Sequence, residues 1–98
     1  MDEVLYQQAV SMLEADLGDE LVGLDPEEGN CFGFNSVATI VWRHLANPKS
    51  FHEIEEMLLA EFDVDRDQCR AELRELIDDL VEKALVRKVP KSDWRRHR

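Results

Sequence analysis

The 98 residues, 44% of them apolar, suffice for one small domain with a modest core and exclude a large buried active site. No apolar run approaches the roughly 18 residues that a membrane span needs, and Met1 opens onto acidic residues rather than the basic start of a signal peptide. We therefore expect a soluble, cytoplasmic protein with no membrane partner.

The net charge of -10 is unevenly distributed along the chain. Residues 1–87 hold 7 Lys and Arg against 21 Asp and Glu, a net charge of -14, whereas residues 88–98 hold 5 against 1, a net charge of +4. An acidic surface repels phosphate backbones, which nucleic-acid-binding proteins neutralise with Lys and Arg. The charge predicts a basic or neutral polypeptide partner and no nucleic acid.

Turn signals divide the first third of the chain into short extended runs. Residues 1–9 form either a frayed arm or a first strand, and residues 9–15 are expected to be extended. A turn at Gly18 leads to a strand over residues 20–25, and a second turn ending at Gly29 leads to a strand over residues 31–34. Three such runs predict an antiparallel meander.

Two amphipathic helices are expected next. Asn35 or Ser36 caps the first, because either side chain can accept a backbone N–H bond. Its apolar residues are Val37, Ala38, Ile40, Val41, Trp42 and Leu45. Pro48 interrupts the pattern, and Ser50 with Glu53 matches a capping box that starts the second helix, which stops near residues 63–64.

The third expected helix is the longest regular element. Asp65 with Gln68 resembles another N-cap pair, and the helix is expected to end between Lys83 and Leu85. Its apolar face is Cys69, Leu73, Leu76, Ile77, Leu80 and Ala84. Three short strands cannot bury their apolar face alone, so we predict an α+β fold in which a three-stranded antiparallel sheet is followed by three helices, similar to a winged helix-turn-helix.

The residues that usually carry catalysis are sparse and scattered. His44, His52 and His97 show no metal-ligand spacing with one another or with Cys31 and Cys69, and neither a nucleophile elbow nor a glycine-rich phosphate loop is present. We predict no metal, no cofactor and no catalysis, and a small metal-dependent enzyme is disfavoured. Both cysteines are expected to be reduced and buried.

The predicted third strand combines two kinds of side chain. Phe32 and Phe34 alternate with Cys31 and Gly33, so one face carries aromatics that we assign to the core. If this strand lies at a sheet edge, its free N–H and C=O groups are a template on which an extended peptide adds a strand, and the two small residues permit close approach. An unpaired edge also permits a strand-exchanged dimer.

The predicted third helix has two flanks beside its core line. One flank carries Arg70, Arg74 and Ile77, and the other carries Glu72, Leu76 and Asp79. Either flank can form the wall of a groove against the third strand, and the charged members are equally explained by solvation or i,i+4 pairing.

The order of these motifs resembles the PqqD-like proteins. Residues 24–35 match that family's Leu-Asp-turn-Gly-x-aromatic segment, and an apolar helix with Ile40 and Trp42 follows. Residues 62–65 and the long helix through Leu73 and Leu80 match its second half. The likeness covers roughly residues 10–87, which fits a recognition domain over residues 1–90 with a basic flexible tail over residues 91–98. Phe34 replaces the family's usual leucine, and Ala84 replaces a helix-ending glycine.

This resemblance implies a non-catalytic recognition element for ribosomally synthesised, modified peptides, most like the free-standing leader-binding proteins of lasso-peptide pathways. The leader would add to the third strand and lie beside the third helix, and the precursor would pass to a separate leader peptidase and cyclase. The implied peptide-binding residues are Cys31, Phe32, Gly33, Phe34, Cys69, Arg70, Glu72, Leu73 and Leu76. The alternative is a winged-helix transcriptional regulator, whose recognition helix would carry basic residues toward the DNA major groove.

Overall fold

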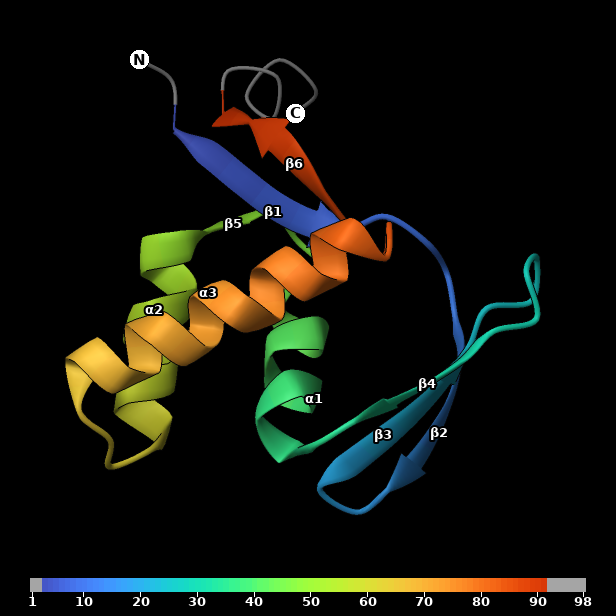
Figure 1. The fold of residues 1–98 in the computed structure, drawn as a ribbon, viewed down its shortest axis with the longest axis horizontal. Coiled ribbons are helices and arrows are strands. Elements are labelled where there is room, and N and C mark those ends of the chain that lie inside the picture. Colours follow the sequence, from blue (N-terminus) through green and yellow to red (C-terminus); the bar gives the residue numbers. More distant parts are fainter. Residues whose placement is uncertain (1–2, 92–98) are drawn as a thin grey trace.

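The computed structural model describes residues 3–91, which form two three-stranded sheets and three helices (Figure 1). The predicted α+β fold with a three-stranded antiparallel sheet and three helices is confirmed. The elements are β1 (Val4–Gln8), β2 (Leu13–Leu17), β3 (Glu20–Leu24), β4 (Cys31–Phe34), α1 (Ser36–His44), β5 (Lys49–Ser50), α2 (Phe51–Glu61), α3 (Arg66–Glu82) and β6 (Val86–Pro90).

The predicted meander is the sheet β2-β3-β4, whose strands are all antiparallel. Its second and third strands lie where the sequence predicts them, but its first strand is Leu13–Leu17 rather than residues 9–15. The turn determines this shift. Gly18 adopts a φ of 82°, which lets a two-residue turn pair Leu17 directly with Glu20.

A second sheet, with the order β5-β1-β6, was not predicted. Of the two alternatives for the N-terminal residues, the strand is correct, and β1 pairs with β6 from Val4↔Pro90 to Gln8↔Val86. Lys91 continues this pairing, since its N–H donates to the carbonyl of Glu3 at 2.9 Å. The remainder of the predicted tail, residues 92–98, lies outside the described residues, and the division at residue 90 stays a prediction.

The helices begin at the predicted caps. Asn35 rather than Ser36 caps α1, since its side chain accepts a backbone N–H bond at 2.9 Å. Both hydrogen bonds of the capping box between Ser50 and Glu53 are present at the start of α2, and Asp65 caps α3. Local side chains therefore determine the three helix starts.

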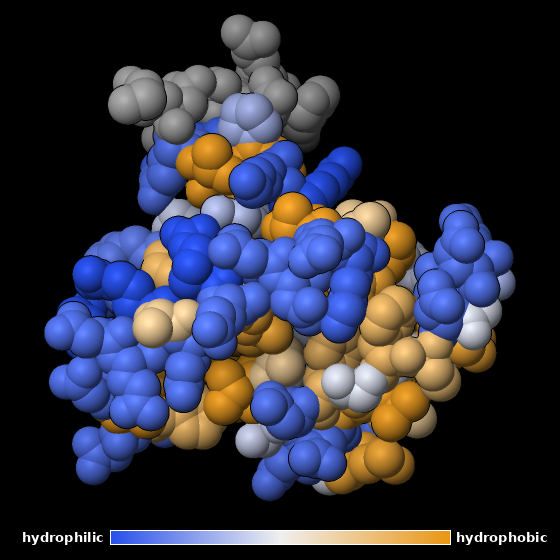
Figure 2. Space-filling view, in the orientation of Figure 1, coloured by the Kyte–Doolittle hydropathy of each residue, from blue (hydrophilic) through white to orange (hydrophobic). Residues whose placement is uncertain are grey.

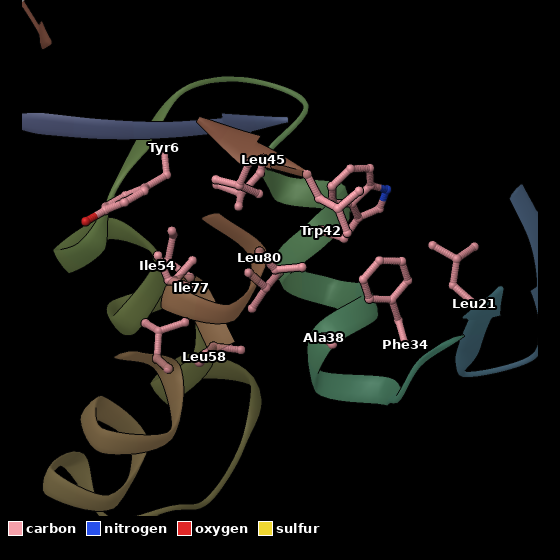
Figure 3. Close-up of a cluster of buried hydrophobic side chains, with 14 of the residues drawn as sticks. Tyr6, Leu21, Phe34, Ala38, Trp42, Leu45, Ile54, Leu58, Ile77 and Leu80 are labelled. Atoms are coloured by element: carbon pink, nitrogen blue, oxygen red, sulfur yellow. The ribbon is translucent and has the colours of Figure 1, made fainter. Parts of the chain in front are cut away.

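Trp42 links α1 to the β2-β3-β4 sheet at the centre of the core (Figure 3). Its side chain is 0% exposed, and its ring stacks on Phe34 of β4 with centroids 5.6 Å apart and planes at 15°. Its indole Nε1 donates to the Glu14 carboxylate of β2 at 3.1 Å. Because Phe34 lies on β4 and Leu21 is buried on β3, this packing holds the sheet against α1.

The end of α3 tolerates alanine where glycine is preferred. Ala84 has a φ of 61°, its N–H donates to the carbonyl of Val81, and the N–H of Leu85 donates to the carbonyl of Leu80 at 2.9 Å. This is the Schellman arrangement, in which the residue after the C-cap is left-handed. The replacement of glycine therefore leaves the motif intact and adds backbone strain at Ala84.

Ala84→Gly is expected to stabilise the fold by about 0.5–1 kcal/mol, because glycine removes the Cβ clash of the left-handed conformation. Urea unfolding followed by circular dichroism measures the change. Ala71→Gly, at an exposed position inside α3, is the matched control and is expected to cost about 1 kcal/mol. Equal destabilisation by both substitutions would contradict this explanation of the helix end.

Candidate functional site

The strand β4 is a free sheet edge. Within residues 3–91 it pairs with β3 on one side and with no strand on the other. It is four residues long and runs directly into α1, so the N-terminal end of that helix lies at the same edge (Figure 1). Strand addition requires that this strand lie at a sheet edge, and within residues 3–91 it does.

The hydrogen-bonding pattern identifies which backbone groups of β4 point outward. The N–H of Asp25 donates to the carbonyl of Asn30 at 2.9 Å, just before the strand begins. Hydrogen-bonded and non-hydrogen-bonded pairs alternate along an antiparallel ladder. The two aromatic residues of β4 therefore bond to β3, whereas Cys31 and Gly33 direct their N–H and C=O groups toward the free edge.

The side chains of β4 divide as the sequence predicts. Phe34 is buried, and Phe32 is partly buried against the core. Gly33 and Cys31 lie on the opposite, exposed face of the strand, so the expectation that both cysteines are buried is wrong for Cys31. Alternation along the strand explains this, because the aromatics occupy the inward positions.

A groove lies between β4 and α3. Its first part, about 320 Å³, is bounded by all four residues of β4 on one side and, on the other, by Leu76 and Asp79 of α3 and by Lys83, the residue that follows this helix. A second pocket of about 310 Å³ shares Asn35, Ala38 and Leu76 with the first. Its other lining residues are Val37, Leu58, Phe62, Val64, Cys69, Glu72 and Leu73.

The wall of this groove is the flank of α3 that carries Glu72, Leu76 and Asp79. Cys69 and Leu73 are buried residues of α3 that also line the second pocket. Burial raises the pKa of the Cys69 thiol, so this sulfur is an uncharged, apolar part of the lining. The structure thus brings together eight of the nine residues that the resemblance implies.

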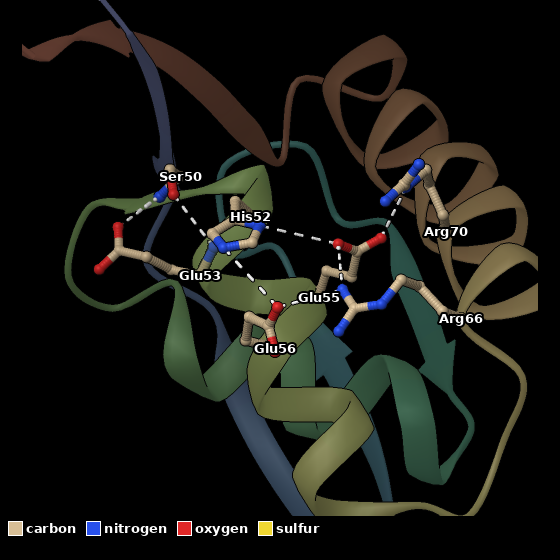
Figure 4. A network of polar contacts seen from close by, with 7 residues as sticks. All are labelled: Ser50, His52, Glu53, Glu55, Glu56, Arg66 and Arg70. Atoms are coloured by element: carbon tan, nitrogen blue, oxygen red, sulfur yellow. Dashed lines mark hydrogen bonds and ion pairs between the residues drawn. The ribbon is translucent and has the colours of Figure 1, made fainter.

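Arg70 is the exception, because it lies on the opposite flank of α3. Its Nε donates to Oε2 of Glu55 at 2.8 Å, where it faces α2 (Figure 4). Arg74 also lies on that side, with its guanidinium 4.1 Å from the ring centroid of Phe51. The placement of Arg70 in the groove is therefore corrected, and the physical reason is the buried carboxylate that binds it.

Sequence reasoning missed several groove residues. Val37 and Val64 are exposed apolar side chains at the second pocket, and Phe62 lines it from the end of α2. Val37 belonged to the predicted apolar face of α1, and its position in the first helical turn, beside the free edge, was the available signal. Lys83 lies beyond the predicted flank, and its Nζ pairs with Asp79 at 2.9 Å.

Glu55 is a buried carboxylate, 1% exposed, that joins α2 to α3 (Figure 4). Arg66 approaches Oε1 at 3.3 Å, Arg70 binds Oε2 at 2.8 Å, and His52 lies 3.8 Å from Oε1. The potential ligand atoms of His52, Glu55 and Glu56 lie within 4.8 Å of one another, which is close enough to hold a metal ion. The two guanidinium groups already neutralise Glu55, so the cluster is explained as an ion-pair network.

Glu55→Gln is expected to destabilise the protein by about 1.5–3 kcal/mol at neutral pH, since hydrogen bonds to a charged group are lost. The Arg70 hydrogen bond is the main reason that the pKa of Glu55 is lowered, opposed by burial. A lowered pKa in the folded state means that this stabilisation is present above the ordinary pKa of glutamate and disappears as the pH falls through the lowered one. Urea unfolding on progressive acidification measures this dependence.

Glu56→Gln is the control for this prediction. Glu56 binds the same Arg66 at 3.0 Å, but its side chain is 46% exposed, so solvent screens the pair. We expect a change within about 0.5 kcal/mol. We expect the difference in unfolding free energy between wild type and Glu55→Gln to shrink on acidification. If the difference stayed the same, the charge of Glu55 would not be the source of the stabilisation.

Comparison with protein families identifies the family of this chain. The profile of the family described as coenzyme PQQ synthesis protein D (PqqD) matches residues 20–86, which include β3, β4, all three helices and the first residue of β6. The chain belongs to the PqqD family. Comparison with curated protein sequences gives no significant match.

Two solved structures resemble this PqqD-family chain. The structure of TbiB1 in complex with the TbiA(beta) leader peptide is 30% identical, with a TM-score of 0.72, and the match covers 82% of this chain and 93% of that one. The structure of a lasso peptide synthetase B1 complexed with the leader peptide is 22% identical, with a TM-score of 0.68. This match covers 87% of this chain and 98% of that one. The second likeness supports the fold. In residues 3–91, no helix has the length and hydropathy required to cross a membrane.

Proposed function

We propose that this PqqD-family protein binds the leader segment of a ribosomally synthesised precursor peptide of the lasso-peptide type. The observation that carries the proposal is the free edge of β4 beside the α3 groove. The leader adds as an antiparallel or parallel strand next to β4, and its side chains on one face enter the groove. The 30% identity to TbiB1, whose structure holds a leader peptide, supports the same use of this fold.

The backbone of β4 supplies the affinity in this proposal. Cys31 and Gly33 each offer one N–H and one C=O to the added strand, and the absence of a side chain at Gly33 keeps the approach open. Hydrogen bonds of this kind do not depend on the peptide's side chains. The edge therefore binds extended peptide, and selection must come from the groove.

The groove supplies the specificity. The second pocket is bounded mainly by apolar side chains, among them Leu58, Leu73 and Leu76, and suits a large apolar side chain of the leader. Glu72 lies at its rim and is exposed, with the amide of Gln68 at 3.4 Å. A basic or hydrogen-bond-donating residue of the leader next to the apolar one would be preferred.

The protein acts without catalysis in this proposal and delivers the bound precursor to a leader peptidase and a cyclase. Cys69 and Glu72 both line the second pocket, but burial raises the pKa of the Cys69 thiol, which disfavours the thiolate that a cysteine nucleophile needs. Two copies are able to pair through the same edge, and a strand-exchanged dimer would then compete with the leader for β4.

The transcriptional-regulator alternative lacks support in the charges of α3. Arg66, Arg70 and Arg74 are its basic residues within the helix, and all of them lie within 4.0 Å of carboxylate oxygens. A recognition helix needs such residues free to reach phosphates and base edges. The acidic charge of residues 1–87 opposes DNA further.

Fluorescence anisotropy tests the proposed function. A fluorescein-labelled synthetic leader from the precursor encoded beside this protein is titrated with the protein, and labelled duplex DNA is titrated separately at moderate salt. We expect saturable binding of the leader and none of the duplex. Salt-sensitive DNA binding in the absence of leader binding would refute the proposal.

A further inference from the structure

Glu55 lies directly behind the wall of the peptide groove, although its side chain is not part of the groove lining. It is 1% exposed and borders a pocket on the other side of α3, together with Arg70 and Arg74. Cys69 connects the two sides, because it lines the second pocket of the groove, and the pKa of its thiol is raised by burial and, next, by the charge of Glu55. The beginning of α3 therefore separates this carboxylate from the proposed leader site.

The two arginines that bind Glu55 both lie in the first half of α3. Arg70 Nε donates to Oε2 at 2.8 Å, and Arg66 Nη1 lies 3.3 Å from Oε1. Arg74, one turn further along the helix, instead donates to the hydroxyl of Tyr6 on β1 at 3.4 Å. Figure 2 shows hydrophilic residues gathered over the region where α2 and α3 lie at the left. The ion pairs of Glu55 therefore fix the beginning of α3 to α2, and its second half depends on other contacts.

The second pocket of the groove is formed by the same parts of α2 and α3. Cys69, Glu72 and Leu73 line it from the first half of α3, and α2 contributes Leu58, three residues after Glu55. Because protein interiors are closely packed, the position of the first half of α3 relative to α2 sets the width of this pocket. A pocket of about 310 Å³ that is already open in the free protein spares the leader the cost of ordering its walls.

We propose that Glu55 is a positioning residue for leader binding, which holds the first half of α3 at the distance from α2 that the second pocket requires. The inference rests on the proposed function, since the ligand of this pocket is the leader. Glu55 acts through Arg66 and Arg70 and does not touch the peptide. Its loss lowers the affinity of the pocket for an apolar side chain, because a loosened wall must be ordered on binding, and leaves the backbone hydrogen bonds of β4 unchanged.

A purely structural role of Glu55 predicts a different result. A destabilised variant that remains folded binds with nearly the wild-type affinity, since the apparent affinity falls only with the fraction of binding-competent molecules. Urea unfolding and circular dichroism establish that the variant is folded under the conditions of the binding experiment. A fall in leader affinity at an unchanged folded fraction therefore reports on the pocket and not on global stability.

The test is a double-mutant cycle between Glu55 and the leader. Anisotropy measures the affinities of the full-length wild type and Glu55→Gln for the synthetic leader, and for leaders in which each large apolar residue in turn is replaced by alanine. We expect Glu55→Gln to bind the intact leader about tenfold more weakly, and the apolar residue that fills the pocket to lose most of its effect in this variant. Glu56→Gln is the matched control, because Glu56 also binds Arg66 but is 46% exposed, and its affinity should change less than about threefold.

Arg70→Gln is a milder second variant, because Arg66 still neutralises Glu55 when Arg70 is replaced. We expect the same pattern with a smaller loss of leader affinity, which keeps the inference testable if Glu55→Gln does not fold. Amide hydrogen exchange of the free proteins locates the change within α3. Exchange should become faster in the first half of the helix and stay unchanged in its last two turns.

Folded Glu55→Gln and Arg70→Gln variants with wild-type affinity for the leader would overturn the inference. So would a loss of affinity that is equal for every leader, because the effect would then not pass through the second pocket. Failure of the proposed function is distinguishable, since it appears as a wild-type protein that does not bind the leader, whatever the variants at Glu55 and Arg70 do.

Discussion

Gly33→Pro is expected to weaken leader binding about 100-fold. Proline removes the outward N–H of residue 33, and its ring occupies the space that the added strand needs, which together cost about 3 kcal/mol. The fold should survive, because that N–H does not bond to β3 and the positive-φ glycines of residues 3–91 are Gly18 and Gly29. Phe32 is already extended, as the residue before proline must be.

Gly33→Ala is the control for the proline substitution. Its Cβ would have no heavy atom within 4 Å in the unliganded protein, and it keeps the N–H. We expect a change in the dissociation constant within about threefold. Anisotropy with the labelled leader measures both variants, and circular dichroism verifies their fold. A folded Gly33→Pro variant with wild-type affinity would place the peptide on another edge.

Trp42→Ala is expected to have the largest effect on stability, a loss of about 3–5 kcal/mol. The substitution empties the centre of the core, removes the stacking on Phe34 and deletes the hydrogen bond to Glu14. Small domains have total stabilities of about 5–15 kcal/mol, so this loss leaves the variant marginal. Urea unfolding followed by far-ultraviolet circular dichroism measures it.

Trp42→Phe separates the contributions at this site. It retains an aromatic ring against Phe34 and loses the indole N–H that Glu14 accepts. We expect a cost of about 1–2 kcal/mol, below that of alanine. A loss under about 1 kcal/mol for Trp42→Ala would contradict the position of this residue as the link between α1 and the sheet.

The local parts of the fold were predictable from local chemistry. Caps such as Ser50 with Glu53 act within four residues, and the turn at Gly29 needs a positive φ, which is 75° in the structure. The β1–β6 pairing was not predictable in this way. It joins segments about 80 residues apart, such as Gln8 and Val86, whose short sequences contain no turn that would bring them together.

The candidate site was predictable as a set of residues, but not as a surface. The helical repeat brought Glu72 and Leu76 to one flank and Arg70 to the other, yet only the position of Glu55 on α2 decides which flank is free. The first strand of the meander was placed at residues 9–15, too early in the chain, because only the turn at Gly18 sets the register that pairs Leu13 with Leu24 and Leu17 with Glu20.

Amide hydrogen exchange measured by NMR, with and without the leader, tests the use of the β4 edge most directly. The N–H groups of Cys31 and Gly33 point to solvent in the free protein, whereas those of Phe32 and Phe34 are assigned to the β3 ladder. We predict that saturating leader slows exchange at Cys31 and Gly33 and changes it much less at the two phenylalanines. Bound leader with unchanged exchange at Cys31 and Gly33 would contradict strand addition to β4.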